Sequence, residues 1–308
     1  MKKLALLSFV MCLFVASCEK NDSGLTKDGL PINCAPNEIV YKTQYGYPIE
    51  LKEGYDDFGG AVLVANLCEK GYCKYVFDAN ITEIPDNAFS ARVSLLSMVI
   101  PNSVTLIGDN AFYGCTSLTS ITIPDSVTTI GDSAFSGCTL LTRVDISDLS
   151  AWCKISFGDS YANPLYYAEK LYLNGSELTD ITIPSDITEI KDYAFRSCSS
   201  LTSVTILDSV TSIGEWAFSY CTSLTSVTIG NSVTSIGDDA FYCCYSLTSV
   251  YCKPTTPPTG GSGMFSYNAN GYYSPIGCKI YVPRNSVSAY KSAEYWSKYA
   301  SYIEGYDF

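Results

Sequence analysis

The sequence of 308 residues contains no histidine. Ser-His-Asp and Cys-His nucleophilic sites use an imidazole as the general base, so this absence excludes both kinds of catalytic site. It also excludes every metal site that depends on histidine ligands. Any chemistry in this chain would therefore rest on paired carboxylates or on thiolates.

Positive charge is also scarce. The chain has 19 Lys and Arg residues against 31 Asp and Glu residues, which gives a formal net charge of −12. Such a surface repels phosphates, and no basic stripe is present, so we expect no nucleic-acid partner. Charged residues make up only 16% of the chain and hydrophobic residues 47%. This composition excludes a disordered chain and is typical of one or two folded domains.

No hydrophobic run is long enough to span a bilayer. The run over 4–17 has 14 residues, against the roughly 20 that a membrane helix needs, and it follows Lys2 and Lys3. It therefore predicts a signal peptide over 1–17. The run ends in "VASC", which resembles a bacterial lipobox and implies lipid attachment at Cys18. The alternative is an ordinary secretory signal with an incidental cysteine. Residues 18–36 are polar and are predicted to form a flexible tether.

What the chain has in abundance is a 23-residue repeat, marked most clearly by phenylalanine. Ala precedes each of these Phe residues, Ile lies five positions before it and Leu six positions after it. A single unit buries too little apolar surface to offset its ordering entropy, whereas stacked units bury the same columns on both sides. The period therefore predicts stacked coils. The Phe residues are Phe89, Phe112, Phe135, Phe195, Phe218 and Phe241.

One unit can be followed in more detail. Residues 118–123 predict a short strand, and Pro124 begins a turn because its ring presets φ. Residues 127–131 predict a second short extended run. Asp132 is expected to cap a short helical turn that directs the following Ala and Phe inward.

The units, written "IPxSVTxIGxxAFxxCTSLTSVTI", resemble the 23-residue, BspA-like (Treponema pallidum-type) class of leucine-rich repeats. The resemblance is dense over 78–252 and extends to the tail of the chain. It implies a curved solenoid with parallel strands on its concave side. It also implies a surface-exposed protein of adhesion or protein binding, of the kind common in Bacteroides-like bacteria.

The predicted fold class is thus a leucine-rich-repeat solenoid, mainly parallel β with short helical turns. The repeats occupy 81–252, and an N-terminal β-hairpin cap over 37–80 covers the first coil. A strand and a helix over 253–308 are expected to cap the last coil, because an open end would expose the core.

An extended repeat at 147–180 interrupts the period. Asn174-Gly175 predicts a type I′ hairpin there. Tyrosines cluster in this segment, either as an aromatic binding platform or as packing of the enlarged coil against its neighbours. These tyrosines are Tyr161, Tyr166, Tyr167 and Tyr172.

Two columns could carry chemistry but also have simpler explanations. A cysteine lies three positions after the Phe in five units, and parallel stacking is poor disulfide geometry, so a stack of buried thiols is expected. An acidic residue lies three positions before each Phe, where Ca²⁺ binding is conceivable and capping of the local turn is the simpler interpretation. No metal site and no cofactor is predicted. Outside the columns, Cys68 and Cys73 flank a hairpin turn and form a possible disulfide.

A third column carries hydroxyls on the strands, and alternation points many of them outward. They are either a binding surface of many weak contacts or a plain solvated surface that favours strands. Positions that depart from the uniform pattern are the better contact candidates. The candidate binding residues are Thr119, Ser120, Thr122, Arg143, Asp145, Thr202, Ser203, Thr205, Thr225, Ser226, Thr228 and Tyr251.

These features predict a non-catalytic outer-membrane lipoprotein at the cell surface that mediates protein–protein binding or adhesion. It would contact the membrane through its lipid anchor only. The family resemblance points to host extracellular-matrix proteins as partners. The alternative function is a glycan-binding lipoprotein that serves polysaccharide uptake. A two-carboxylate glycosidase is a further alternative, but the acidic residues recur at capping positions instead of converging.

Overall fold

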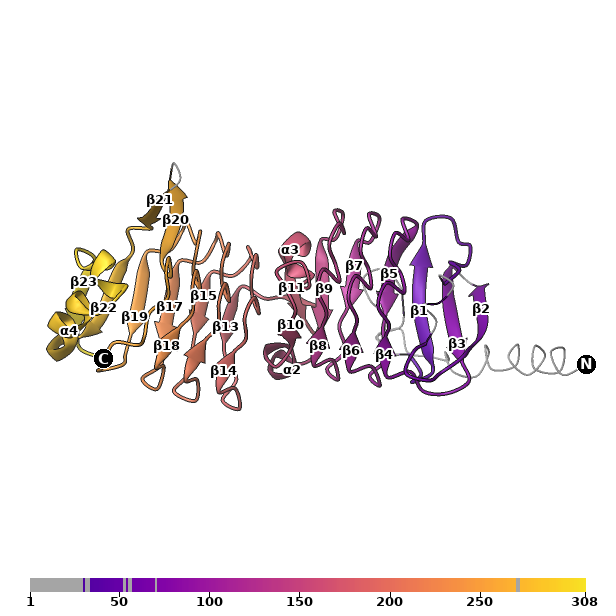
Figure 1. Ribbon diagram of the computed structural model, residues 1–308, viewed down its shortest axis with the longest axis horizontal. Helices are drawn as coiled ribbons and strands as arrows, with labels where there is room; N and C mark the ends of the chain where they lie inside the picture. The colour runs from indigo at the N-terminus through magenta and orange to yellow at the C-terminus, as the bar shows by residue number, and fades with distance from the viewer. Residues whose placement is uncertain (1–29, 31–33, 52–53, 55–56, 70, 270–271) are drawn as a thin grey trace, which may run out of the picture. The chain divides into compact units, whose positions relative to one another are not determined.

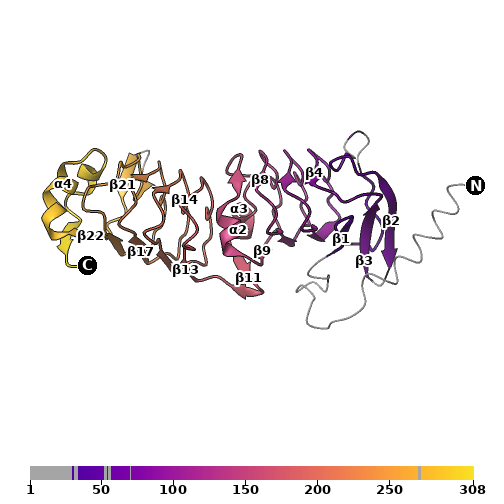
Figure 2. The same ribbon diagram turned by 90° about the horizontal axis from the view of Figure 1, so that it is seen from below.

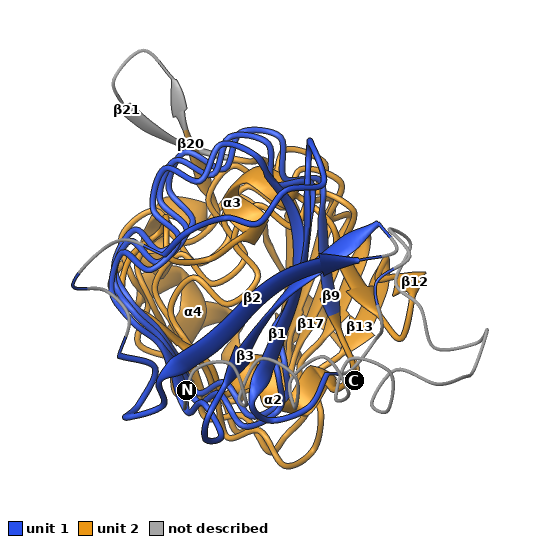
Figure 3. Cartoon of the chain, turned by 90° about the vertical axis from the view of Figure 1, so that its right-hand side faces the viewer, with its two compact units in different colours: residues 1–145 blue, residues 146–308 orange. Residues whose placement is uncertain are grey.

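The computed structural model describes residues 30, 34–51, 54, 57–69, 71–269 and 272–308, which belong to two compact units, residues 1–145 and 146–308 (Figures 1 and 3). The predicted signal peptide and Cys18 lie outside the described residues. The expected solenoid is confirmed in both units. Each coil contributes one strand to a main parallel sheet and a shorter strand to a second stack.

In the first unit, an antiparallel group of three strands precedes the parallel coils. Strand β1 pairs antiparallel with β3 and with β5, whereas β5, β7 and β9 are parallel. The second stack of β4, β6 and β8 is parallel as well. The strands are β1 Glu38–Thr43, β2 Leu63–Glu69, β3 Tyr72–Phe77, β4 Glu83–Ile84, β5 Leu95–Val99, β6 Leu106–Ile107, β7 Ser120–Thr122, β8 Thr129–Ile130 and β9 Arg143–Ile146.

In the second unit, six strands form a parallel sheet in the order β13-β15-β17-β19-β22-β23, and β14, β16 and β18 form the opposite stack (Figure 2). The main-sheet strands are β13 Asp180–Thr182, β15 Ser203–Thr205, β17 Ser226–Ile229, β19 Ser249–Cys252, β22 Lys279–Pro283 and β23 Ile303–Tyr306. The opposite stack is β14 Glu189–Ile190, β16 Ser212–Ile213 and β18 Ser235–Ile236.

The extended repeat opens this unit with two short helices, α2 Leu149–Cys153 and α3 Leu165–Ala168, and the short strand β10 Ser156–Phe157. Strands β11 Leu171–Leu173 and β12 Ser176–Glu177 form the hairpin that Asn174-Gly175 predicts, and both turn residues have positive φ. A second hairpin, β20 Ser266–Ala269 and β21 Tyr272–Pro275, follows the last coil.

The phenylalanine column forms the core of both units. Phe112 and Phe135 stack at 5.0 Å between ring centroids, and Phe218 and Phe241 at 5.2 Å. All of these rings are fully buried. Phe265, which lies 24 residues after Phe241, stacks on it at 5.3 Å. The stack therefore runs one coil further than the strict period of the sequence shows.

Four members of the acidic column, Asp86, Asp109, Asp192 and Asp238, bind the next coil, which corrects for these positions the expectation that each caps its own turn. The Asp109 carboxylate accepts the backbone N–H of Asp132 at 2.8 Å, one coil further on. Asp86 accepts the N–H of Asp109 at 2.7 Å in the same way. Asp192 and Asp238 do the same in the second unit. The turns themselves are closed by i→i+3 backbone bonds, such as Cys138 N–H to Phe135 O. The column is therefore a rung between coils.

Both ends of the solenoid are covered. In the first unit, Phe58 and Tyr75 pack on the first ring of the column, Phe89, at 6.2 and 5.8 Å. In the second unit, Trp296 and Tyr299 pack on Phe265. The predicted C-terminal helix is shorter than its spacing indicates. It comprises α4 Val287–Ser292, after the 3-10 turn Arg284–Ser286 and before the 3-10 turn Trp296–Tyr299.

The end of the predicted tether also has a defined place. Leu30 is buried and packs with Val40 and Val99 on the outer face of the first sheet, and Cys34 lies against this cluster. The hairpin of β2 and β3 carries a disulfide between Cys68 and Cys73. Among the described residues, none of the helices combines the length and the hydrophobicity that crossing a membrane requires.

Candidate functional site

The outward face of the parallel sheet in the second unit carries most of the predicted contact residues. Strand alternation buries Val204, Val227 and Val250 at 0–1% exposure. The residue after each Val points outward, and these residues lie in register across the sheet. The outward column is Thr182, Thr205, Thr228, Tyr251 and Tyr281.

Part of the predicted hydroxyl surface is already engaged in holding the coils together. The Thr225 hydroxyl donates to the carbonyl of Thr202 at 2.9 Å, and Thr202 donates to Thr179 at 3.0 Å. In the first unit, Thr119 donates to Leu96 O at 3.0 Å. These threonines are therefore structural rungs. A hydroxyl that donates to the backbone of the preceding coil can still accept a hydrogen bond from a ligand, so their role as contact residues stays a prediction.

The serine positions differ from one another. Ser120 is only 8% exposed and is a poor contact candidate, contrary to expectation. Ser203 donates its hydroxyl to the Asp180 carboxylate at 2.5 Å. Together with the hydroxyls of Thr179 and Thr202, this bond lowers the pKa of Asp180. Ser226 is half-exposed and remains accessible on the outward face, as do Thr122, Thr205 and Thr228.

Arg143 and Asp145 replace the residues typical of the repeat at their positions, but their side chains form an ion pair with each other. Both lie on the outward face of β9, two residues apart. The guanidinium Nε donates to Asp145 Oδ2 at 2.7 Å, and a terminal nitrogen donates to Oδ1 at 2.6 Å. Their side chains are 14% and 18% exposed. A bidentate pair of this kind is geometrically rigid, so its first role is to fix the surface of the strand.

Tyr251 lies in an aromatic cluster that the sequence analysis did not identify. Its ring stacks on Tyr281 at 5.0 Å with an interplanar angle of 18°. Tyr306 contacts both rings, at 5.6 and 5.4 Å, and Phe308 lies 5.1 Å from Tyr306. Tyr306 is 42% exposed and Phe308 51%. We call Tyr251, Tyr281, Tyr306 and Phe308 the sheet-end cluster.

The pattern in "KIYVP" places Tyr281 on the outward side of a strand, so alternation was a usable signal for this residue. No sequence pattern indicated that Tyr306 and Phe308 belong to this cluster, because β23 follows an irregular cap segment.

A groove borders the sheet-end cluster, lined by residues of β22, β23 and the cap. It contains the cations Lys253 and Arg284, and Arg284 pairs with Asp307 at 2.7 Å. On the sheet beside it, Lys279 pairs with Glu304. This end of an acidic molecule thus combines large exposed rings with positive and negative groups. Aromatic and Arg side chains are enriched at protein interfaces.

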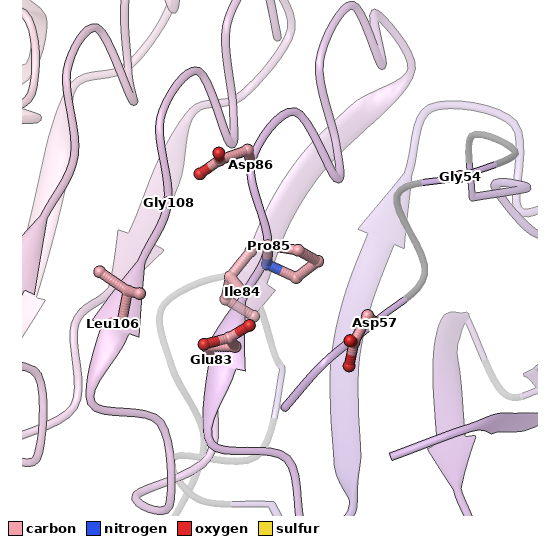
Figure 4. Close-up of a pocket in the computed structure, with 8 residues that line it drawn as sticks. All are labelled: Gly54, Asp57, Glu83, Ile84, Pro85, Asp86, Leu106 and Gly108. Atoms are coloured by element: carbon pink, nitrogen blue, oxygen red, sulfur yellow. The ribbon is translucent and has the colours of Figure 1, made fainter. Parts of the chain in front are cut away.

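A depression in the first unit brings three carboxylates near one another, those of Asp57, Glu83 and Asp86 (Figure 4). The three side chains are spread over the depression and do not point at one position. One oxygen of Asp86 is already bound to the next coil. No group of three or more His, Cys, Asp or Glu side chains in the described part of the chain is arranged to hold a metal ion.

The cysteine column consists of buried thiols, as the parallel stacking of coils predicts. Cys138 Sγ donates to the carbonyl of Phe112 at 3.2 Å, and Cys221 to that of Phe195 at the same distance. Burial raises the pKa of these thiols, to about 12 for Cys115. The thiolate is the reactive form, so the column is chemically inert near neutral pH.

A leucine-rich repeat solenoid is the class of protein that this fold defines. The family described as "BspA type Leucine rich repeat region" matches residues 73–161 and 167–280, with six copies of the repeat. The chain therefore belongs to the BspA-type leucine-rich repeat family. A comparison with curated protein sequences finds no match.

Solved structures similar to this chain are also leucine-rich repeat proteins. One from T. pallidum is 27% identical over 61% of this chain and 71% of its own, with a TM-score of 0.35. One from Eubacterium ventriosum is 20% identical over 67% of this chain and 64% of its own, with a TM-score of 0.37. A leucine-rich cell surface protein of Faecalibacterium prausnitzii is 21% identical over 67% and 86%, with a TM-score of 0.25.

Proposed function

We propose that the chain is a non-catalytic, lipid-anchored protein of the outer membrane that faces outward and binds another protein through the outward sheet face. The observation that carries the proposal is the sheet-end cluster. Contiguous exposed aromatic surface on a folded domain marks an interaction site. Tyrosine anchors also supply much of the binding energy in protein interfaces. The family resemblance points to a host extracellular-matrix protein as the partner.

The repeat itself supplies the variant that tests this function. Tyr251 and Tyr281 lie in the column that holds Thr205 and Thr228 in other coils, so the double change Tyr251→Thr and Tyr281→Thr restores the residue typical of the repeat. We expect the fold to persist. Affinity for an extracellular-matrix protein should fall at least tenfold, about 1.4 kcal/mol. Surface plasmon resonance against a panel of purified matrix proteins measures it.

The matched control is Tyr113→Ser, which removes a tyrosine that is 49% exposed in the first unit and lies outside the sheet-end cluster. This control should bind as the wild type does. Equal binding by the wild type and the double variant would contradict the proposed interface. Absence of binding to every matrix protein would remove that class of partner.

Anchoring and orientation need a separate experiment. Protease treatment of intact cells should cut the wild-type chain and spare a periplasmic lipoprotein. Cys18→Ser should release the chain from the membrane fraction, because the acyl chains that hold it would be missing. If the chain is protected until the envelope is broken, it lies within the envelope, and the proposed role in adhesion is contradicted.

A glycan is the second candidate partner, because the second unit carries aromatic rings around Arg196 on a surface that does not include the sheet-end cluster.

A further inference from the structure

The second unit carries another cluster of rings, on the turns around Phe195, Phe218 and Phe241 and on α3 with the segment before it. The guanidinium carbon of Arg196 lies 4.8 Å from the Trp216 ring centroid, 5.1 Å from Tyr220 and 5.6 Å from Tyr166. The Tyr161 ring contacts the Tyr166 ring at 4.6 Å between centroids, and the Tyr242 ring contacts the Tyr220 ring at 5.6 Å. We call Tyr161, Tyr166, Arg196, Trp216, Tyr220 and Tyr242 the Arg196 ridge.

The ridge follows one edge of the unit. Tyr166 belongs to α3, and Figure 1 shows α3 and the β20–β21 hairpin at the same edge, with the turns of the coils between them. Tyr161 is 38% exposed and Tyr220 36%, so the ridge presents ring surface to solvent. The sheet-end cluster shares none of these residues.

The repeat gives no folding reason for these rings. Trp216 occupies the column that holds Asn110 and Ser133 in the first unit, and Tyr220 the column that holds Gly114 and Gly137. Both positions are left-handed, with φ of 56° for Trp216 and 61° for Tyr220. Asn and Gly tolerate this conformation, whereas bulky side chains rarely adopt it. All six coils adopt the left-handed conformation at these two positions, so the repeat sets the backbone, and the bulky rings of Trp216 and Tyr220 depart from the small or polar residues that suit it.

The polar groups of the ridge narrow the class of ligand. Arg196 Nε is buried without a hydrogen-bond partner, and no ion pair of Arg196 occurs within the described residues. Two carboxylates are bonded to residues of the ridge: Glu215 accepts the indole N–H of Trp216 at 2.9 Å, and Asp159 accepts the backbone N–H of Tyr161 at 2.8 Å. The ridge thus combines one guanidinium with two carboxylates. This balance disfavours an anionic ligand and offers both donors and acceptors to an uncharged one.

We propose that the Arg196 ridge binds a neutral polysaccharide. A sugar ring has a flat face of C–H groups and a rim of hydroxyls. The flat face would pack on the exposed rings of Tyr161 and Tyr220, which supply large apolar area at low entropic cost. The rim would exchange hydrogen bonds with Arg196 and with the carboxylates beside it. This site lies on a different surface from the proposed protein interface and takes a different partner.

Affinity gel electrophoresis of the purified chain without its signal peptide tests the proposal. Native gels would contain soluble β-glucan, xyloglucan, galactomannan, arabinoxylan or starch, with polygalacturonate as an acidic polysaccharide. We expect at least one neutral polysaccharide to retard the wild type. The double variant Trp216→Asn and Tyr220→Gly, which inserts the residues of a sister coil, should weaken this binding at least tenfold. Its Tm should not fall, since both new residues tolerate left-handed backbone.

Two controls separate this site from the protein interface. Tyr113→Ser and the double variant Tyr251→Thr and Tyr281→Thr should both be retarded as the wild type is. The proposal is overturned if no neutral polysaccharide retards the wild type, if polygalacturonate alone does, or if the ridge variant is retarded equally. If the ridge variant melts lower, Tyr161→Ala at the edge of the ridge decides the matter. Loss of retardation with an unchanged Tm supports the proposal, and full retention overturns it.

Discussion

At the scale of the residue, the repeat depends on a glycine and an acid that meet across neighbouring coils. Gly131 does not have the positive φ for which glycine is usually needed. Gly131 has no room for a side chain, because a Cβ at this position would lie 2.7 Å from the backbone nitrogen of Asp109 and 2.9 Å from the carbonyl carbon of Gly108. The close approach of the preceding coil therefore requires glycine at position 131. The same approach lets the Asp109 carboxylate accept the backbone N–H of Asp132 in the coil that follows.

Gly131→Ala should consequently destabilise the protein by about 2–3 kcal/mol, because the new methyl meets backbone atoms that cannot move independently. Thermal denaturation measures the loss. Gly46→Ala is the control, since its Cβ would meet nothing within 4 Å and only its positive φ is unfavourable. A loss for Gly131→Ala no larger than that for Gly46→Ala would show that the coils can separate to accommodate a side chain.

Asp180 provides a pH-dependent test. Hydroxyl donors, first of all Ser203, lower the pKa of Asp180, so its stabilising contribution is present at pH 7 and is lost as the pH falls through the lowered pKa. Asp180 is exposed, which limits the contribution to about 0.5 kcal/mol. Asp180→Asn should lower the Tm at pH 7, and the difference from the wild type should vanish once the pH has fallen below the lowered pKa of Asp180. Ser203→Ala should show a smaller difference. A difference that persists or widens in acid would contradict this account.

At the scale of the element, the sequence predicts the columns well but not their partners. Identical residues every 23 positions fix which side chains are buried, and the Phe and Cys columns lie in the core as expected. The acid and threonine columns are different. A side chain that caps its own turn and a side chain that binds the neighbouring coil are of the same residue types and stand at the same positions, so the sequence does not distinguish these two roles. The structure distinguishes them, because the distance between coils is set by the packing of the whole stack.

The threonine rungs can be tested with two residues of one coil. Thr225 donates its hydroxyl to Thr202 O, whereas the Thr228 hydroxyl makes no hydrogen bond within the described residues. Thr225→Val should lower stability by about 1 kcal/mol, since it leaves shape and strand propensity nearly unchanged but removes the bond. Thr228→Val is the matched control and should have little effect. Denaturant titration of both variants measures the difference, and equal losses would argue against a structural rung.

At the scale of the whole molecule, the ends were the hardest part to predict. The need for caps follows from the exposed core of a terminal coil, and both caps are present. Their detail does not follow. Phe265 continues the ring column after a spacing of 24 residues instead of 23, so the strict period misses it. The apolar spacing of the last segment suits one helix, but Ala293 is extended and Tyr295 has a positive φ, which divide it into α4 and a 3-10 turn.

Trp296→Ala tests how much the C-terminal cap contributes. The indole is fully buried, contacts Phe265 and Tyr290, and donates its N–H to Pro258 O at 2.8 Å. Removing it should cost about 3–5 kcal/mol of stability in the second unit. Scanning calorimetry should show a lower transition, and Tyr245→Ala, at a ring that is 57% exposed, should change it far less. A loss below about 1 kcal/mol would mean that the last coil needs no cap.

The rungs between coils have a genetic consequence. Apart from the rung from Asp238 to Ser262, which spans 24 positions, the rungs described above join a residue to its counterpart 23 positions away, as Asp109 does with Asp132 and Thr202 with Thr225. A crossover between two repeats that adds or removes one whole unit therefore leaves every rung with an equivalent partner. A gene of this kind can lengthen or shorten its product within one generation, at about 4.8 Å of sheet per unit, without new compensating mutations. The aromatic clusters combine particular side chains from several neighbouring coils, so the same crossover would move these side chains apart or erase them.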